Sequence, residues 1–153
     1  MGITGPHITT VERAKQLASA CRYVPQGKRS FGSGRGAYFG KFPSGPEYMA
    51  HANAHLLVMA QLEDVEVLDD LDEILLVEGI DLYSSGPQDI AQSMGLPGQP
   101  DHPRVKEFEA QVTGAVHALG KKMNDEVMVA APATELFLGA AEAFLEAEKG
   151  KRE

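Results

Sequence analysis

The sequence predicts an α/β fold, because segments with helical periodicity alternate with short apolar runs that are typical of buried strands. Of the 153 residues, 43% are hydrophobic, which is enough to bury a core. Strands that are separated by helices commonly pair in parallel. We therefore expect a single domain over residues 1–153, built on a parallel sheet.

Helices are predicted where apolar side chains recur at helical spacing. The first begins after Thr9 or Thr10, either of which is suited to cap a helix, and continues through Ala18. Further helices are expected near residues 47–54, 67–75, 105–119 and 134–148. Pro87 suits the first turn of one more helix.

Strands are predicted at residues 55–62, 80–85 and 127–131, where apolar and β-branched residues run together. Residues 25–45 contain glycine and proline at a density that predicts a loop. This loop is not a phosphate-binding P-loop, because it lacks the Gly-Lys-Ser/Thr order that leads into a helix. Residues 94–103 form a second predicted loop.

Charge and cysteine content argue against several classes of protein. A net charge of -8 and a pI near 5.1 disfavour a nucleic-acid-binding surface. No apolar run approaches the roughly 20 residues that span a bilayer, and the N-terminus lacks the features of a secretory signal. The single cysteine, Cys21, is expected to be a buried structural thiol. We expect a cytoplasmic protein without nucleic-acid or membrane partners.

Two carboxylates follow two successive predicted strands. Glu63 comes at the end of the first strand, and Asp89 lies just past the end of the second. Ligands gather at this end of parallel strands, and two close carboxylates are stabilised by a hard divalent cation. The alternative is that Glu63 or Asp64 simply starts the next helix, and that Asp89 lies in a first helical turn only because the helix dipole favours a negative charge there.

Five short motifs occur in a fixed order along the chain. They are GPHI at residues 5–8, CRYVPQGKRSFG at 21–32, MAQLE at 59–63, GPQD at 86–89 and GLPGQPDHP at 95–103. Over roughly the first 120 residues, these segments resemble the HpcH/HpaI aldolase/citrate lyase family, within the pyruvate and phosphoenolpyruvate TIM barrels. The resemblance implies a metal-dependent, class II pyruvate aldolase with a partial TIM-barrel fold.

The same resemblance implies the chemistry of the site. Glu63 and Asp89 would bind the divalent ion, which is Mg2+ or Mn2+ by family habit, with Co2+ and Zn2+ as alternatives. The substrate would be a 4-hydroxy-2-keto acid that releases or accepts pyruvate. The residues expected to contact it are Gln61, Gly86, Pro87 and Gln88. Gly86 would allow a close approach, and backbone N–H groups at the following helix start would face the substrate carboxylate.

Family barrels are complete at about 250 residues, whereas this chain is expected to begin near the fourth strand. The catalytic arginine and histidine of the family lie in the first three strands, so neither role maps onto a position here. His7, at a strand end, is the catalytic candidate of this chain. The other histidines are expected at helix surfaces or in a turn: His51, His55, His102 and His117.

An open half-barrel exposes strand edges and apolar faces, so we expect either self-association or a complementing chain. Two alternatives to the aldolase remain open. One is a non-catalytic or complementing subunit that keeps the metal and 2-keto-acid pocket, and the unmapped arginine and histidine favour it. The other is a 2-keto acid decarboxylase. Retention of both presumed metal ligands within their motifs favours an active lyase.

Overall fold

A computed structural model describes residues 2–42, 44–129 and 132–149 of the chain. Its centre is a three-stranded sheet in the order β1-β2-β3, and both strand pairs are parallel. The strands are β1 (Gly2–Gly5), β2 (Leu57–Gln61) and β3 (Leu82–Ser84). Because all three run in one direction, their carboxyl ends lie at one edge of the sheet.

Helices connect the strands in the alternating order that the sequence predicts. The α-helices are α1 (Val11–Cys21), α2 (Gly45–His55), α3 (Val67–Leu75), α4 (Pro87–Ser93), α5 (Pro103–Ala118) and α6 (Ala133–Lys149). Two short 3-10 helices, η1 (Arg35–Gly40) and η2 (Asn124–Glu126), interrupt the loops. Thr10 caps α1 by accepting a hydrogen bond from the backbone N–H of Arg13, as expected of an N-cap threonine.

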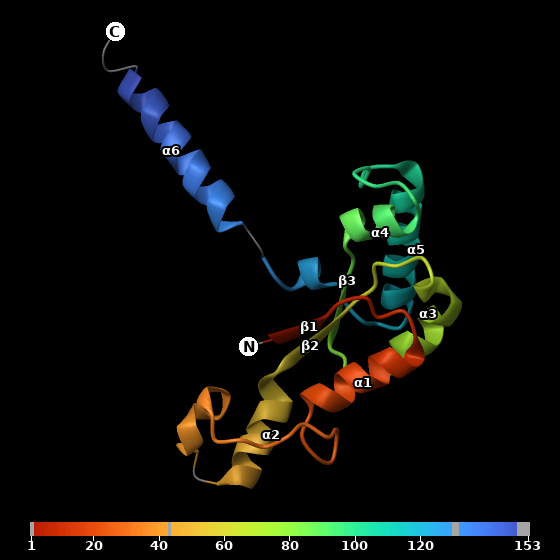
Figure 1. The fold of residues 1–153 in the computed structure, drawn as a ribbon, viewed down its shortest axis with the longest axis vertical. Coiled ribbons are helices and arrows are strands. Elements are labelled where there is room, and N and C mark those ends of the chain that lie inside the picture. The colour runs from red at the N-terminus through yellow and green to blue at the C-terminus, as the bar shows by residue number, and fades with distance from the viewer. Residues whose placement is uncertain (1, 43, 130–131, 150–153) are drawn as a thin grey trace.

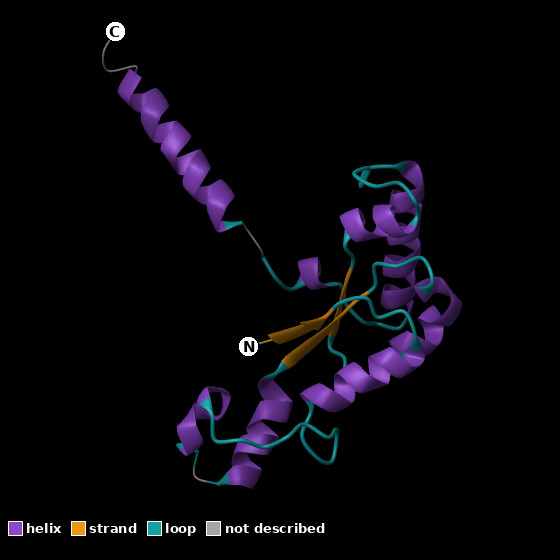
Figure 2. Ribbon diagram, viewed as in Figure 1, coloured by secondary structure: helices purple, strands orange, loops and turns teal. Residues whose placement is uncertain are grey.

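Helices cover one face of the sheet, whereas no described helix covers the other. Figure 1 and Figure 2 show α1, α3 and α5 on one side of the three strands. On β2, Val58 and Ala60 are fully buried toward these helices, whereas Leu57 is 42% exposed. Met59 and Gln61, which share the face of Leu57, are half-buried. One face of β2 is therefore shielded from water, and the other is partly accessible to it.

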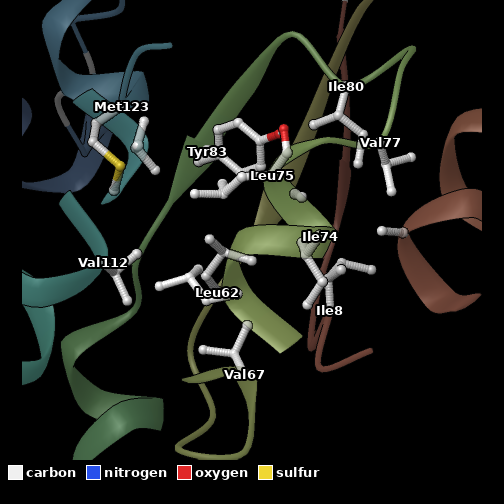
Figure 3. Close-up of a cluster of buried hydrophobic side chains, with 14 of the residues drawn as sticks. Ile8, Leu62, Val67, Ile74, Leu75, Val77, Ile80, Tyr83, Val112 and Met123 are labelled. Carbon is white, nitrogen blue, oxygen red and sulfur yellow. The ribbon is translucent and has the colours of Figure 1, made fainter. Parts of the chain in front are cut away.

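The core lies between the sheet and the covering helices. Figure 3 shows Ile74 and Leu75 of α3 in the same cluster as Leu62, Tyr83 and Val112. Burial raises the pKa of Tyr83 to about 12. Its hydroxyl donates to the carbonyl of Leu75 and accepts a hydrogen bond from Lys121 at 3.1 Å. The polar end of this large side chain is thus paired inside an apolar core.

Arg22 ties the end of α1 to the start of the sheet. Its guanidinium is 4% exposed, forms an ion pair with Asp81 and donates to the carbonyl oxygens of Gly79, Asn53 and Leu56. Asp81 also accepts the backbone N–H of Val58 at 2.7 Å. A buried charge is tolerated only when it is paired in this way.

The C-terminal helix stands apart from the sheet. Figure 1 shows α6 extending away from the other helices, and none of its described side chains is buried. Leu136, Phe137, Phe144 and Leu145 are each more than half exposed. Within the described part of the chain, no helix is long and apolar enough to cross a membrane.

The sequence-based assignment of elements differs from the structure at three places: β1 (Gly2–Gly5) is not among the predicted strands, η1 lies within the loop predicted over residues 25–45, and the third predicted strand does not form. The strand expected at residues 127–131 is wrong over Val127–Val129, which follow η2 as a turn and an irregular segment; Ala130 and Ala131 lie outside the described residues. The chain instead touches the sheet earlier, through a parallel bridge between Tyr83 and Met123. Burial explains the error, because Met123 is buried whereas Val129 is fully exposed.

We expect Arg22→Ala to lower the free energy of unfolding by about 3 kcal/mol, because Asp81 and the partner carbonyls lose their charged donor. Urea denaturation followed by circular dichroism measures this change. Arg104→Ala is the matched control: Arg104 is exposed, so its loss should change stability by less than about 0.5 kcal/mol. Equal, small effects in both variants would contradict the assigned role of Arg22.

Candidate metal and substrate site

Three strand ends bring the predicted site residues together at one edge of the sheet. His7 lies just beyond β1, Glu63 just beyond β2, and Gly86 and Asp89 follow β3. Backbone hydrogen bonds hold these strand ends in place: Ile8 N–H donates to Gln61 O at 3.0 Å, and Leu62 N–H donates to Ser84 O at 2.8 Å. The parallel register therefore places residues that are far apart in the sequence next to each other.

Glu63 is the most deeply buried carboxylate of this edge, with only 2% of its side chain exposed. Its Oε1 accepts the backbone N–H of His7 at 3.1 Å. Its Oε2 is buried and has no hydrogen-bond partner among the described residues. Burial raises the pKa of Glu63, and the neighbouring Asp89 and Asp64 raise it further, while the hydrogen bond from His7 lowers it. An unpaired, buried carboxylate oxygen is costly, so this atom is suited to bind a positive group.

Gly86 lies directly against this oxygen. A Cβ atom at residue 86 would be 2.5 Å from Oε2 of Glu63 and 3.3 Å from both Oδ2 of Asp89 and Nε2 of Gln61. The glycine thus occupies the point where three polar side chains converge, and any larger residue would displace them. This geometry brings together Gln61, Glu63, Gly86 and Asp89, four of the seven residues that the sequence predicts for the site.

His7 is also at the site, held by polar contacts on both sides. Its Nδ1 lies 3.0 Å from Oδ2 of Asp64 and 3.4 Å from Oε1 of Glu63, and its carbonyl oxygen accepts Nη1 of Arg13 at 2.7 Å. Its φ of 52° lies in the left-handed region, which is uncommon for a residue other than glycine. The hydrogen bond to Asp64 raises the pKa of His7. The side chain is half exposed, so its ring is open to a ligand.

The remaining predicted residues, Pro87 and Gln88, form the first turn of α4. Gly86 is the N-cap, and no side chain caps this end of the helix. Asp89 also lies in this first turn and is exposed. Its position is therefore compatible both with a ligand role and with simple stabilisation of the helix dipole. The corresponding alternative for Glu63 does not hold, because the N-cap of α3 is Glu66.

The other histidines lie elsewhere. His102 caps α5 by accepting the N–H of Arg104, and His117 pairs with Glu126. His51 and His55 stack on each other on α2. Among the described residues, no group of three or more His, Cys, Asp and Glu side chains forms a metal-binding cluster. The two ligands that the sequence predicts, Glu63 and Asp89, are both carboxylates, and a cation held by so few protein ligands keeps several waters, as Mg2+ commonly does.

The comparison with known proteins identifies the fold and the family. The chain matches the family model for HpcH/HpaI aldolase/citrate lyase over residues 1–148. It belongs to this family. Over 118 residues it is 40% identical to the 2-keto-3-deoxy-L-rhamnonate aldolases of Shigella sonnei (strain Ss046) and Escherichia coli (strain K12). The match covers 76% of this chain and 43% of each relative, so the chain spans less than half the length of these curated relatives.

Solved structures of the HpcH/HpaI family give the same result. The chain superposes on a family protein from Burkholderia cenocepacia J2315 with a TM-score of 0.80 and 25% identity, over 96% of this chain and 65% of that one. For the HpcH/HpaI aldolase of Desulfitobacterium hafniense DCB-2 the TM-score is 0.71 and the identity 27%, over 98% and 61% of the two chains. The predicted fold class, a partial TIM barrel of α/β type, is confirmed.

Sequence reasoning did not assign a role to Asp64 or Arg13, both of which hold His7. Asp64 is adjacent to the predicted ligand Glu63, which is a usable signal for a second polar group at the strand end. Arg13 lies on α1 and reaches back to the carbonyl of His7. No pattern in the sequence indicates that contact, because it depends on the unusual backbone conformation of His7.

In the metal-free protein at neutral pH, we expect Glu63→Gln to raise the free energy of unfolding by about 1 kcal/mol, because a neutral amide avoids the burial of an unpaired charge. The pKa of Glu63 is raised in the folded protein, so its ionisation destabilises the fold above that pKa. The difference in unfolding free energy between Glu63→Gln and the wild type should therefore shrink as the pH is lowered through the pKa of Glu63.

Urea denaturation in EDTA at several pH values measures this difference. Glu107→Gln is the control, because Glu107 is exposed on α5 and its neutralisation should change stability by less than about 0.5 kcal/mol. If Glu63→Gln proved less stable than the wild type at neutral pH without metal, the described burial cost would be wrong.

Proposed function

We propose that this protein is a divalent-metal-dependent carbon-carbon lyase that releases pyruvate from a 4-hydroxy-2-keto acid, or adds pyruvate in the reverse direction. The observation that carries the proposal is the buried, unpartnered Oε2 of Glu63, which lies beside Asp89 across Gly86. Family membership supports the same class of reaction. The 2-keto-3-deoxy-L-rhamnonate aldolases that it resembles are named for substrates of this type.

Glu63 and Asp89 fit a hard divalent ion, because both supply carboxylate oxygens and Oε2 of Glu63 has no hydrogen-bond partner in the described part of the chain. We propose Mg2+ or Mn2+, with Co2+ and Zn2+ as alternatives. When bound, such an ion supplies Lewis acidity, which stabilises negative charge on the keto oxygen as the carbon-carbon bond breaks.

The chain's own residues would bind and orient the substrate. Gly86, which carries no side chain, allows a close approach to the carboxylate of Glu63, and the nearby Gln61 amide would donate a hydrogen bond to the substrate. Backbone N–H groups in the first turn of α4, at Gln88 and Asp89, can face the substrate carboxylate, and Pro87 fixes the start of that turn. His7 is the candidate for moving a proton, since Asp64 holds its Nδ1 and the ring remains half exposed.

A non-catalytic subunit with the same pocket is the second candidate, favoured by the openness of the sheet. Gln61 and Met59 lie on the face that no described helix covers and are partly exposed, so water reaches this side of β2, next to the buried Glu63. Catalysis by fixed dipoles is strongest where water is excluded. Under this candidate, the chain binds the metal and a 2-keto acid but does not turn it over. Decarboxylation of a 2-keto acid, which also needs the metal, is distinguished by its release of carbon dioxide.

We also propose that the protein acts as an assembly, either of identical copies or with a complementing chain. The uncovered sheet face and the exposed apolar side chains of α6 support this, because isolated proteins rarely expose such continuous apolar surface. If the chain self-associates, light scattering coupled to size-exclusion chromatography should give a mass of at least two chains of 16.4 kDa each. A mass of one chain that does not change as the protein concentration is raised would contradict self-association.

We expect the purified protein to release pyruvate from a panel of 4-hydroxy-2-keto acids only when Mg2+ or Mn2+ is present. Asp89→Asn should abolish both metal binding and pyruvate release, because it removes one of two charged ligands. A coupled lactate dehydrogenase assay measures the release, and calorimetric titration with Mn2+ measures the binding. Asp72→Asn, on the exposed face of α3, is the matched control and should behave as the wild type.

The outcomes separate the candidates. Metal-dependent release that is lost in Asp89→Asn supports the lyase. Metal binding without turnover of any 2-keto acid indicates the binding subunit instead. Unchanged Mn2+ binding in Asp89→Asn would contradict the assigned site under either candidate.

A further inference from the structure

Two histidines on α2 form a pair that is separate from the carboxylate site. His51 and His55 are four residues apart, so the helix places them one above the other on the same face. Their rings stack with centroids 4.1 Å apart and an angle of 20° between the ring planes. Both residues are exposed, so the pair is open to a ligand from solvent.

The orientation of each ring is fixed by a neighbour. Nδ1 of His55 lies 2.8 Å from the carbonyl oxygen of His51. A carbonyl oxygen can only accept, so Nδ1 carries the proton in the neutral ring and Nε2 keeps its lone pair. Phe42 packs against His51 with ring centroids 5.2 Å apart. A hydrogen bond at the second ring nitrogen is the usual way in which a protein orients a metal-binding histidine.

The two rings are close enough for both side chains to reach one ion. Two nitrogens bound to a tetrahedral Zn2+ at about 2.1 Å lie roughly 3.4 Å apart. Because the lone pairs lie in the ring planes, which are 20° apart, both side chains must rotate from the stacked arrangement before both nitrogens can point at one ion. Histidines at positions i and i+4 of a helix are the arrangement by which zinc enzymes present two ligands from one helix. Glu47, one turn earlier, is engaged by the Ser44 hydroxyl and is not counted as a ligand.

We propose that His51 and His55 form a second metal site, which chelates an imidazole-preferring transition ion such as Zn2+, Ni2+ or Cu2+, with water in the remaining positions. The site differs in kind from the one at Glu63 and Asp89, whose oxygen ligands suit Mg2+ and Mn2+. It does not depend on the proposed aldolase activity. In an assay that contains Zn2+, the histidine pair takes up metal that is unrelated to turnover.

The test is calorimetric titration of the full chain with Zn2+, in the wild type and in the variants His51→Ala and His55→Ala. The second imidazole binds intramolecularly, so the loss of either ring should weaken this Zn2+ binding about 100-fold. His117→Ala, which removes an exposed histidine on α5, is the matched control and should keep wild-type affinity. Glu63→Gln should also keep it, which separates the two sites.

Far-UV circular dichroism of each variant checks that α2 remains helical; exposed positions of this kind tolerate alanine. Wild-type Zn2+ affinity in both His51→Ala and His55→Ala would overturn the proposal. An equal loss in His117→Ala would also overturn it, because the binding would then belong to scattered surface imidazoles. Excess Mg2+ should leave the Zn2+ titration of the histidine pair unchanged, and competition by Mg2+ would count against an imidazole site.

Discussion

The buried carboxylate of Glu63 is the constraint on which the arrangement of the strand ends depends. One of its oxygens accepts the His7 N–H and the other has no partner within residues 2–42, 44–129 and 132–149, although the side chain is almost inaccessible to water. A buried charge of this kind costs several kcal/mol unless a positive group offsets it. Gly86 keeps the space beside the orphan oxygen free, and Asp89 adds a second negative charge to it. The free energy of the folded chain therefore includes an unfavourable electrostatic contribution that a bound cation would reduce.

Much of this fold could be predicted from the sequence, because the helices carry strong apolar periodicity and the strands are short runs between them. Glu63 and Asp89 could be placed together for the same reason, since each follows a predicted strand and parallel strands end at one edge. Local sequence was not enough at residues 127–129, where an apolar run has β-type composition but no neighbour to bury it. It was also not enough for Arg13, which donates to the backbone carbonyl of His7, a residue in the left-handed conformation.

The open face of the sheet links stability to function. On β2, the residues that point toward the helices are dry, whereas those on the side of Gln61 are accessible. Electrostatic interactions between charged groups and a substrate strengthen as water is excluded. The carboxylate pair would therefore interact more strongly with a bound cation and substrate if the open face of the sheet were covered. The exposed apolar side chains of α6 are a surface that such an assembly could bury. Assembly and activity are therefore expected to change together.

The most direct test of the carboxylate site is Mn2+ binding to wild type, Gly86→Ala and Gly114→Ala, measured by calorimetry. A methyl group at residue 86 would lie within 2.5 Å of Oε2 of Glu63, whereas one at Gly114, on α5, would meet nothing within 4 Å. We predict that Gly86→Ala loses Mn2+ binding while remaining folded and that Gly114→Ala retains it. Equal Mn2+ affinity in all three proteins would contradict a metal site at Glu63 and Asp89.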